Sequence, residues 1–88
     1  MKVVKEKLVG KITHYFTNIG VAVIEVTTGE LKAGDMIHIK GATSDFEQKI
    51  GSLQIEHETV EKAKKGQSAG LKTDQQVREG DEVYKIEE

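Results

Sequence analysis

Apolar and polar residues alternate in short runs along the chain, and this period of two is typical of β-strands. Turn signals rich in glycine separate the runs at intervals of roughly 8–12 residues. The pattern predicts an all-β domain of six to seven short strands, closed into a small antiparallel-rich barrel because a single small sheet must protect its own edges. The predicted strands span residues 7–16, 21–26, 36–40, 44–57, 68–73 and 77–86.

The first two predicted strands show which faces we expect to be buried. In the first strand, the even-numbered residues share one largely apolar face: Leu8, Gly10, Ile12, His14 and Phe16. A glycine inside a strand indicates a bend or a close approach of another backbone. In the second strand, Val21 and Val23 lie on the face that points away from that strand's apolar row, so we expect the strand to pack on both faces.

The longest extended segment, residues 44–57, changes phase midway. Phe46 and Ile50 lie on one parity, and the apolar positions from Leu53 onward lie on the other. A β-bulge near residues 51–52 is predicted to return both halves to one side and to bend the strand, as the corner of a barrel requires.

Residues 56–65 allow two structures. Glutamate–lysine pairs four residues apart would support a single helical turn. The alternative is a strand that continues through Val60, followed by a turn that ends at Gly66. The sequence pattern leaves both open.

Two units of the chain nearly repeat each other, at residues 31–40 and 77–86. Each has an apolar residue, a base, one further residue, Gly-Asp and then a strand. Glycine can adopt the positive φ of a tight turn, and aspartate can bond the backbone that follows it. We therefore expect four residues to build equivalent turns rather than a catalytic carboxylate pair: Gly34, Asp35, Gly80 and Asp81.

The length of 88 residues indicates a single domain over residues 1–88, with residues 1–6 as a loose arm or the start of the first strand. The absence of cysteine excludes disulfides, a thiolate nucleophile and cysteine-ligated metals. No apolar run approaches the ~20 residues that span a bilayer, and charges occupy the N-terminus where a signal peptide needs apolar residues. We therefore expect a cytoplasmic protein without a membrane partner.

The three histidines, His14, His38 and His57, lie on different predicted strands without metal-ligand spacing. No serine has the sequence context of a catalytic nucleophile. We expect no catalytic residues, no cofactor, no metal and no enzymatic activity.

Partner-binding candidates come from the charged positions. The net charge of −2, with Arg78 as the single arginine, does not favour nucleic-acid binding by bulk electrostatics. Lys7 and Lys11 lie near Tyr15, however, and a basic and aromatic face can meet RNA by phosphate contact and stacking. His38 and Lys40 are further candidates. The alternative for all five is ordinary solvated strand surface.

Several motifs occur in the order found in a known domain: Val9-Gly10-Lys11-Ile12, Gly20-Val21-Ala22, Gly34-Asp35, Lys49-Ile50-Gly51-Ser52-Leu53-Gln54, Val60, Ala63, Gly66, Gly70-Leu71 and Gly80-Asp81. Over about residues 7–86 the chain resembles the second-domain β-barrel of translational GTPases such as elongation factor Tu and initiation factor 2. The resemblance implies a six- to seven-stranded closed barrel. In that family the barrel contacts the GTPase domain, the acceptor end of tRNA or ribosomal RNA.

The chain lacks the Gly-x-x-x-x-Gly-Lys-Ser/Thr loop that cradles phosphates, so we expect no GTP binding. It is similar to stand-alone translation elongation factor-like proteins. The resemblance does not determine the role of these proteins, and our first hypothesis is a non-enzymatic, RNA-associated binding module that docks on a ribonucleoprotein, the ribosome or a translation or tRNA-handling partner. A related barrel also ends U32 peptidase-like proteins. The alternative is therefore an accessory that binds such an enzyme through apolar surface, with Val21, Val23 and Met36 as candidates.

Overall fold

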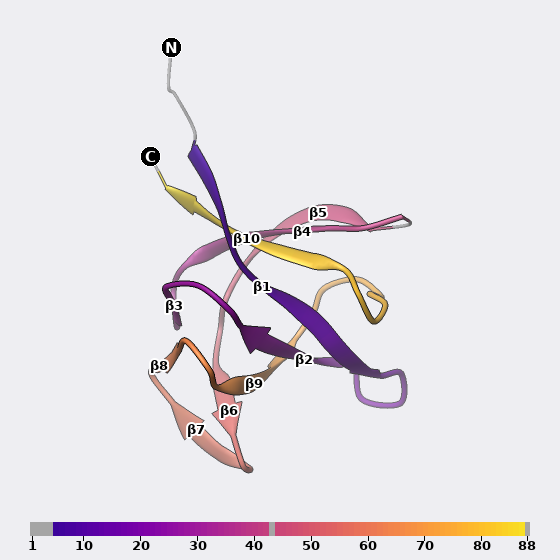
Figure 1. The fold of residues 1–88 in the computed structure, drawn as a ribbon. Helices are drawn as coiled ribbons and strands as arrows, with labels where there is room; N and C mark the ends of the chain where they lie inside the picture. The colour runs from indigo at the N-terminus through magenta and orange to yellow at the C-terminus, as the bar shows by residue number, and fades with distance from the viewer. Residues whose placement is uncertain (1–4, 43, 88) are drawn as a thin grey trace.

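The computed structural model describes residues 5–42 and 44–87, and within these ranges the protein is all-β, without a helix (Figure 1). The ten strands are β1 (Lys5–Phe16), β2 (Val21–Val26), β3 (Glu30–Lys32), β4 (Met36–Lys40), β5 (Asp45–Lys49), β6 (Leu53–Ile55), β7 (Glu58–Val60), β8 (Lys62–Lys64), β9 (Ser68–Lys72) and β10 (Glu82–Glu87). The short strands β3, β7 and β8 raise the number above the predicted six to seven, because segments that read as turns pair over three residues each.

Eight strands form one antiparallel sheet in the order β5-β4-β10-β1-β2-β9-β6-β7, and β3 pairs with β8. Figure 1 shows the long β1 running through the middle of the molecule, between β10 and β2. The sheet curls around one core, and the ladders among the described residues leave β5 and β7 at its ends. The predicted all-β fold, resembling domain 2 of translational GTPases, is confirmed.

The core is made of aliphatic side chains contributed by most of the strands and by the two turn units. It consists of Val9, Ile12, Ala22, Ile24, Val26, Leu31, Ile37, Ile39, Ile50, Leu53, Ala63, Ala69, Leu71, Val77 and Val83. Branched side chains of this kind pack well on a pleated surface, and their burial supplies the main driving force for folding. Leu31 and Val77, the apolar residues that open the two repeated units, are both fully buried.

The buried face predicted for β1 is wrong at both ends, because two bulges shift the side-chain parity. One bulge lies between Leu8 and Gly10 in the ladder with β10, and the other between Ile12 and His14 in the ladder with β2. Each bulge moves later residues to the opposite face. As a result Leu8 and Phe16 are 41% and 45% exposed, while Ile12 stays in the core.

The close backbone approach predicted at Gly10 is confirmed. A Cβ atom on Gly10 would lie 2.3 Å from the carbonyl oxygen of Glu25 in the neighbouring strand. No other residue type fits at this position without a shift of one strand, which is the reason that a glycine lies inside the longest strand of the sheet.

The phase change after residue 49 is not a β-bulge. β5 ends at Lys49 and β6 begins at Leu53, and the strand is interrupted between them. Ile50 points into the core from this connection, where its N–H donates to the carbonyl of Asp35 at 2.8 Å. The interruption brings Ile50 and Leu53 to the same side, which is the result that a bulge was predicted to give.

Residues 56–65 contain no helical turn. The chain reverses at Glu56 and His57, which have φ values of 51° and 67°, and β7 then pairs with β6. After Val60, β8 pairs with β3 before the turn at Gly66. Neither predicted structure is observed as such: the extended conformation reaches Val60, but as the second strand of a hairpin rather than as a continuation of β6, and β8 precedes the turn at Gly66.

The N-terminal prediction is tested only in part. Lys5 and Glu6 already belong to β1, where they pair with Glu87 and Ile86 of β10, so they are not a loose arm. Residues 1–4 lie outside the described residues. Across the part of the chain that is described, no helix has the length and apolar character needed to cross a membrane.

Candidate functional site

The two predicted turns share one geometry. The Oδ2 atoms of Asp35 and Asp81 accept hydrogen bonds from the backbone N–H groups of Lys32 and Arg78, at 2.9 and 3.0 Å. Gly34 and Gly80 have φ values of 95° and 92°. The equivalence is confirmed, and with it the backbone-bonding role of the aspartates. The donor, however, precedes the aspartate by three residues rather than following it.

Five charged residues alternate in sign across the outer face of the sheet. Residues that lie directly opposite each other in a ladder share a face. Along β2, β1, β10, β4 and β5 this rule places the following residues in one row: Glu25, Lys11, Glu82, Lys40 and Asp45. Each lysine is flanked by acidic residues on both sides. The row therefore neutralises itself and offers little net positive charge to a phosphate backbone.

The five predicted partner-binding residues do not form one surface. Lys11, His38 and Lys40 lie on the outer face. Tyr15 lies opposite Ala22, a fully buried residue, and packs against the core. Lys7 pairs with Lys85 of β10, which in turn pairs with the buried Ile37 of β4. The bulge at Val9 changes the side-chain parity of β1, so Lys7 and Lys11 do not share a face. The predicted basic and aromatic face is therefore not assembled.

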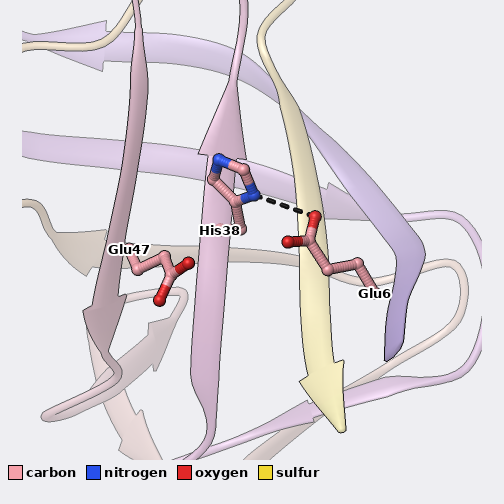
Figure 2. Close-up of side chains that lie close together, drawn as sticks. All are labelled: Glu6, His38 and Glu47. Atoms are coloured by element: carbon pink, nitrogen blue, oxygen red, sulfur yellow. Dashed lines mark hydrogen bonds and ion pairs between the residues drawn. The ribbon is translucent and has the colours of Figure 1, made fainter. Parts of the chain in front are cut away.

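His38, on β4, instead lies among carboxylates from two other strands, β1 and β5. Its Nδ1 is 2.8 Å from Oε1 of Glu6, and its Nε2 bonds Oδ1 of Asp45. Glu47 lies directly across from His38 in β5, and Figure 2 shows Glu6 and Glu47 on either side of the imidazole. The ring of Tyr84, directly opposite in β10, lies beside the imidazole with a centroid distance of 6.4 Å.

The surrounding carboxylates favour the charged imidazolium. The hydrogen bond to Asp45 and then that to Glu6 raise the pKa of His38 above 6.5, and partial burial opposes them. In the protonated form both ring nitrogens donate, which matches the two acceptors. The arrangement links β1, β4 and β5 through one proton-dependent pair of hydrogen bonds.

Glu6, His38 and Glu47 are also the described residues that could together hold a metal ion. Their ligand atoms lie within 4.8 Å of one another. A metal would have to displace the proton and the carboxylate from one nitrogen of His38. No sequence motif predicts this cluster, because its members are far apart in the chain and meet only through the register of three strands.

A second outer surface, an apolar groove of about 380 Å³, lies at the other end of the sheet. Its lining consists of Phe16, Ile19, Val21, Val23, Gln54, Glu56, His57, Ser68 and Gly70. Ile19 is 62% exposed, the largest exposed fraction among the large apolar side chains described. The groove contains two of the three residues that the sequence offered as apolar contacts, Val21 and Val23. Met36 lies elsewhere, on β4.

Two tight turns wall the groove and a glycine forms its floor. The end of β1 and the β1–β2 turn supply Phe16 and Ile19, and the β6–β7 turn supplies Glu56 and His57. Between them, Gly70 pairs with Val23 of β2 and with Gln54 of β6. Because Gly70 has no side chain, the sheet surface is hollow between the two turns. Figure 1 shows the β6–β7 hairpin at the end of the molecule away from the N-terminus.

Similar sequences occur inside longer proteins. The chain is 42% identical over 81 residues to an uncharacterized protease of Methanocaldococcus jannaschii, a match that covers 91% of this chain and 20% of that protein. It is 41% identical over 80 residues to a collagenase of Porphyromonas gingivalis, covering 90% of this chain and 22% of the collagenase. The chain thus spans about a fifth of the length of the curated relatives that it matches.

Similar folds occur in two crystal structures of the C-terminal domain of a Geobacillus thermoleovorans protein assigned to the U32 peptidases. Both have a TM-score of 0.82, with identities of 18% and 19%. The matches cover 88% and 97% of this chain, and 96% and 97% of the solved domains. At this level of identity the likeness concerns the fold. The family itself follows from a match of residues 20–81 to the model of elongation factor Tu domain 2, and the chain belongs to the elongation factor Tu domain 2 family.

Proposed function

We propose that this chain is a non-catalytic interaction module that associates with the catalytic region of a U32 peptidase-like protein. The observation that carries the proposal is the pattern of coverage. About nine-tenths of the chain aligns at 41–42% identity with only about a fifth of a protease and a collagenase. A unit of this kind has to work beside the remaining four-fifths of such proteins.

The surfaces of the domain support binding through apolar contacts. The charged row on the outer face alternates in sign, whereas the groove between Phe16 and His57 is largely apolar. Exposed apolar surface of this kind marks sites where proteins associate. Association of this type depends weakly on salt, because few counterions are released.

A second candidate function is docking on RNA or a ribonucleoprotein, in line with membership of the elongation factor Tu domain 2 family. The residues proposed for it are Lys7, Lys11, Tyr15, His38 and Lys40. Lys11 and Lys40 share one row, but Glu82 lies between them. This candidate requires binding that weakens steeply with salt.

Affinity capture from native lysate of the source organism, at low and high salt, tests both functions. We expect a U32 peptidase-like protein to be identified by mass spectrometry in similar yield at both salt concentrations, without enrichment of RNA. Recovery of ribosomal RNA or ribosomal proteins at low salt, lost at high salt, would contradict the proposal and favour the second candidate. A tagged, unrelated β-barrel of similar charge serves as the control.

A further inference from the structure

We infer that the groove between the β1–β2 and β6–β7 turns is the surface through which the domain binds the catalytic region. Its occupant is a protein segment with apolar side chains next to a lysine or arginine. The inference rests on the proposed function and names the site and the chemistry of the contact. Neither the carboxylate cluster at His38 nor the charged row takes part in it.

The apolar character of the groove is the first argument. Phe16 and Ile19 stand at one wall, 45% and 62% exposed, and Val21 and Val23 continue the apolar surface along the floor. Aromatic and aliphatic side chains gathered around a concave site are the usual anchors of a protein interface. An occupant that removes Phe16 and Ile19 from water gains binding free energy from the burial of both side chains.

The shape of the groove is the second argument. A Cβ atom at Gly70 would lie 3.4 Å from Cγ1 of Val21, so a methyl group fits there and a larger side chain would enter the groove. The backbone of Gly70 has no positive φ that would require glycine. The hollow therefore depends on the missing side chain, and its volume of about 380 Å³ accommodates a few inserted side chains.

The charge at the rim decides the class of partner. The lining includes the carboxylate of Glu56 and, among the described residues, neither lysine nor arginine. A nucleic acid would bring phosphates against this carboxylate without a lysine or arginine to receive them. A protein segment with a basic residue beside its apolar anchors complements both the floor and the rim.

The source of the segment follows from the lengths compared above. The relatives contain about four-fifths of their sequence outside the region that this chain matches. Domains within one polypeptide bury apolar surface against each other. The catalytic region of a U32 peptidase-like protein is therefore the occupant to which we assign the groove, rather than a second copy of this chain.

Side-chain footprinting by carbene labelling tests the assignment. The M. jannaschii protease is prepared with its matching fifth replaced by this chain, and labelling is compared with that of the free 88-residue chain. We expect labelling of Phe16 and Ile19 to fall severalfold in the full-length protein. Labelling of Leu8 and Met36, exposed apolar residues away from the groove, should stay the same. The same comparison within the unaltered protease, at the aligned positions, covers the case in which the exchange prevents folding.

Two pairs of matched variants separate the apolar and the charged contacts. Ile19→Asp should restore the labelling of Phe16 to the level of the free chain, whereas Met36→Asp should not. Glu56→Lys should raise the labelling of Phe16, and Glu58→Lys should leave it protected, because Glu58 is an exposed neighbour outside the lining that undergoes the same change of charge.

The outcomes distinguish the inference from the proposed function. Protection confined to Leu8 and Met36 would overturn the groove assignment and keep the association. Equal labelling of the whole domain, free and within the full-length protein, would overturn both. Protection of Phe16 in the free chain that grows with its concentration would assign the groove to a second copy instead. Equal effects of Glu56→Lys and Glu58→Lys would remove the basic residue from the description of the occupant.

Discussion

The turn at Gly34-Asp35 and the turn at Gly80-Asp81 have the same local design in different surroundings. The hydrogen bonds from the backbone to the two aspartates differ by only 0.1 Å, and the φ values of the two glycines differ by 3° (95° and 92°). The side chain of Asp35 is 21% exposed and its Oδ2 lies 3.4 Å from Nζ of Lys85, whereas Asp81 is 5% exposed. The comparison shows that local sequence determines the turn, and packing determines how much stability each turn contributes.

The strands that leave the two turns pair with each other around one point. β4 and β10 run antiparallel, and His38, the fourth residue after Gly34, lies directly opposite Tyr84, the fourth residue after Gly80. The repeated units therefore have a local two-fold arrangement, with His38 and Tyr84 at its centre. The carboxylates do not follow this two-fold arrangement, because Glu6 of β1 and Asp45 of β5 both contact the histidine.

The largest effect is expected at Gly41, which lies against the buried turn only. A Cβ atom on Gly41 would lie 1.9 Å from Oδ1 and 2.5 Å from Cγ of Asp81, so Gly41→Ala must displace the aspartate from its hydrogen bond with Arg78. We expect a loss of about 3 kcal/mol in the free energy of unfolding, measured by urea denaturation.

Two controls give the Gly41 prediction its specificity. Gly51→Ala, at a position where no described atom lies within 4 Å of the added Cβ, should be nearly neutral. In an Asp81→Ala background the clash is relieved, so Gly41→Ala should cost clearly less than in the natural chain. Additive costs for Gly41→Ala and Asp81→Ala would show that the contact between them is not the cause.

The next largest effect is the difference in stability cost between alanine substitutions of the two aspartates. Asp81→Ala removes a part-buried acceptor and leaves the N–H of Arg78 without its partner, at a cost of about 2 kcal/mol. Asp35→Ala removes a less buried acceptor whose donor can turn to water, together with the partly exposed ion pair to Lys85, and we expect a cost below about 1 kcal/mol. Urea denaturation of the two variants measures the difference, and equal costs would mean that burial does not distinguish the turns.

These local features could be predicted from the sequence because each depends on neighbouring residues. Gly-Asp two residues after a base forms the same turn at both places in this chain, and alternation in residues 21–26 correctly placed Ala22, Ile24 and Val26 in the core. Membership of the translation-factor domain 2 family was likewise recognisable from the order of such motifs. The family and the all-β fold were therefore within reach of the sequence alone.

The surfaces could not be predicted, because they depend on register. The bulges at Val9 and Thr13 turn Tyr15 toward the core and Phe16 toward the outer face. As a result the predicted basic and aromatic face does not form, and Phe16 becomes part of one wall of the groove. The cluster at His38 requires β1, β4 and β5 to align. Val21 and Val23 were the exception, since an apolar residue on the polar parity of a strand is a local signal for surface contact.

Alanine substitutions at the two turn glycines test whether the backbone of the two turns is equally constrained. Gly34→Ala and Gly80→Ala both place a side chain in the left-handed region, and no described atom lies within 4 Å of either added Cβ. The cost is therefore backbone strain alone, about 1 kcal/mol for each variant. Thermal or urea unfolding should give equal values within error. A clearly larger cost at Gly80 would show that the surroundings of Asp81 also constrain the glycine.

The smallest effect on stability is expected for His38, at the centre of the two-fold arrangement, and it depends on pH. Because Asp45 and Glu6 raise the pKa of His38 in the folded state, the folded protein binds the proton more tightly than the unfolded chain does. The stability from this pair is complete below pH 6.5 and is lost as the pH rises through the folded pKa. The groups that face His38 are Glu6 on β1, Asp45 and Glu47 on β5, and Tyr84 on β10.

His38→Gln should therefore flatten the decline in stability above pH 6.5, by less than about 1 kcal/mol, since the carboxylate of Asp45 is largely exposed. Urea denaturation at half-unit pH intervals measures the slope. The control is His57→Asn, at an exposed turn position with φ of 67° that asparagine tolerates, and it should keep the natural slope. Tyr84 occupies the equivalent position in the second unit and is not placed between carboxylates in the same way. If the decline of stability with pH persists in His38→Gln, the groups that cause it lie outside the two-fold centre.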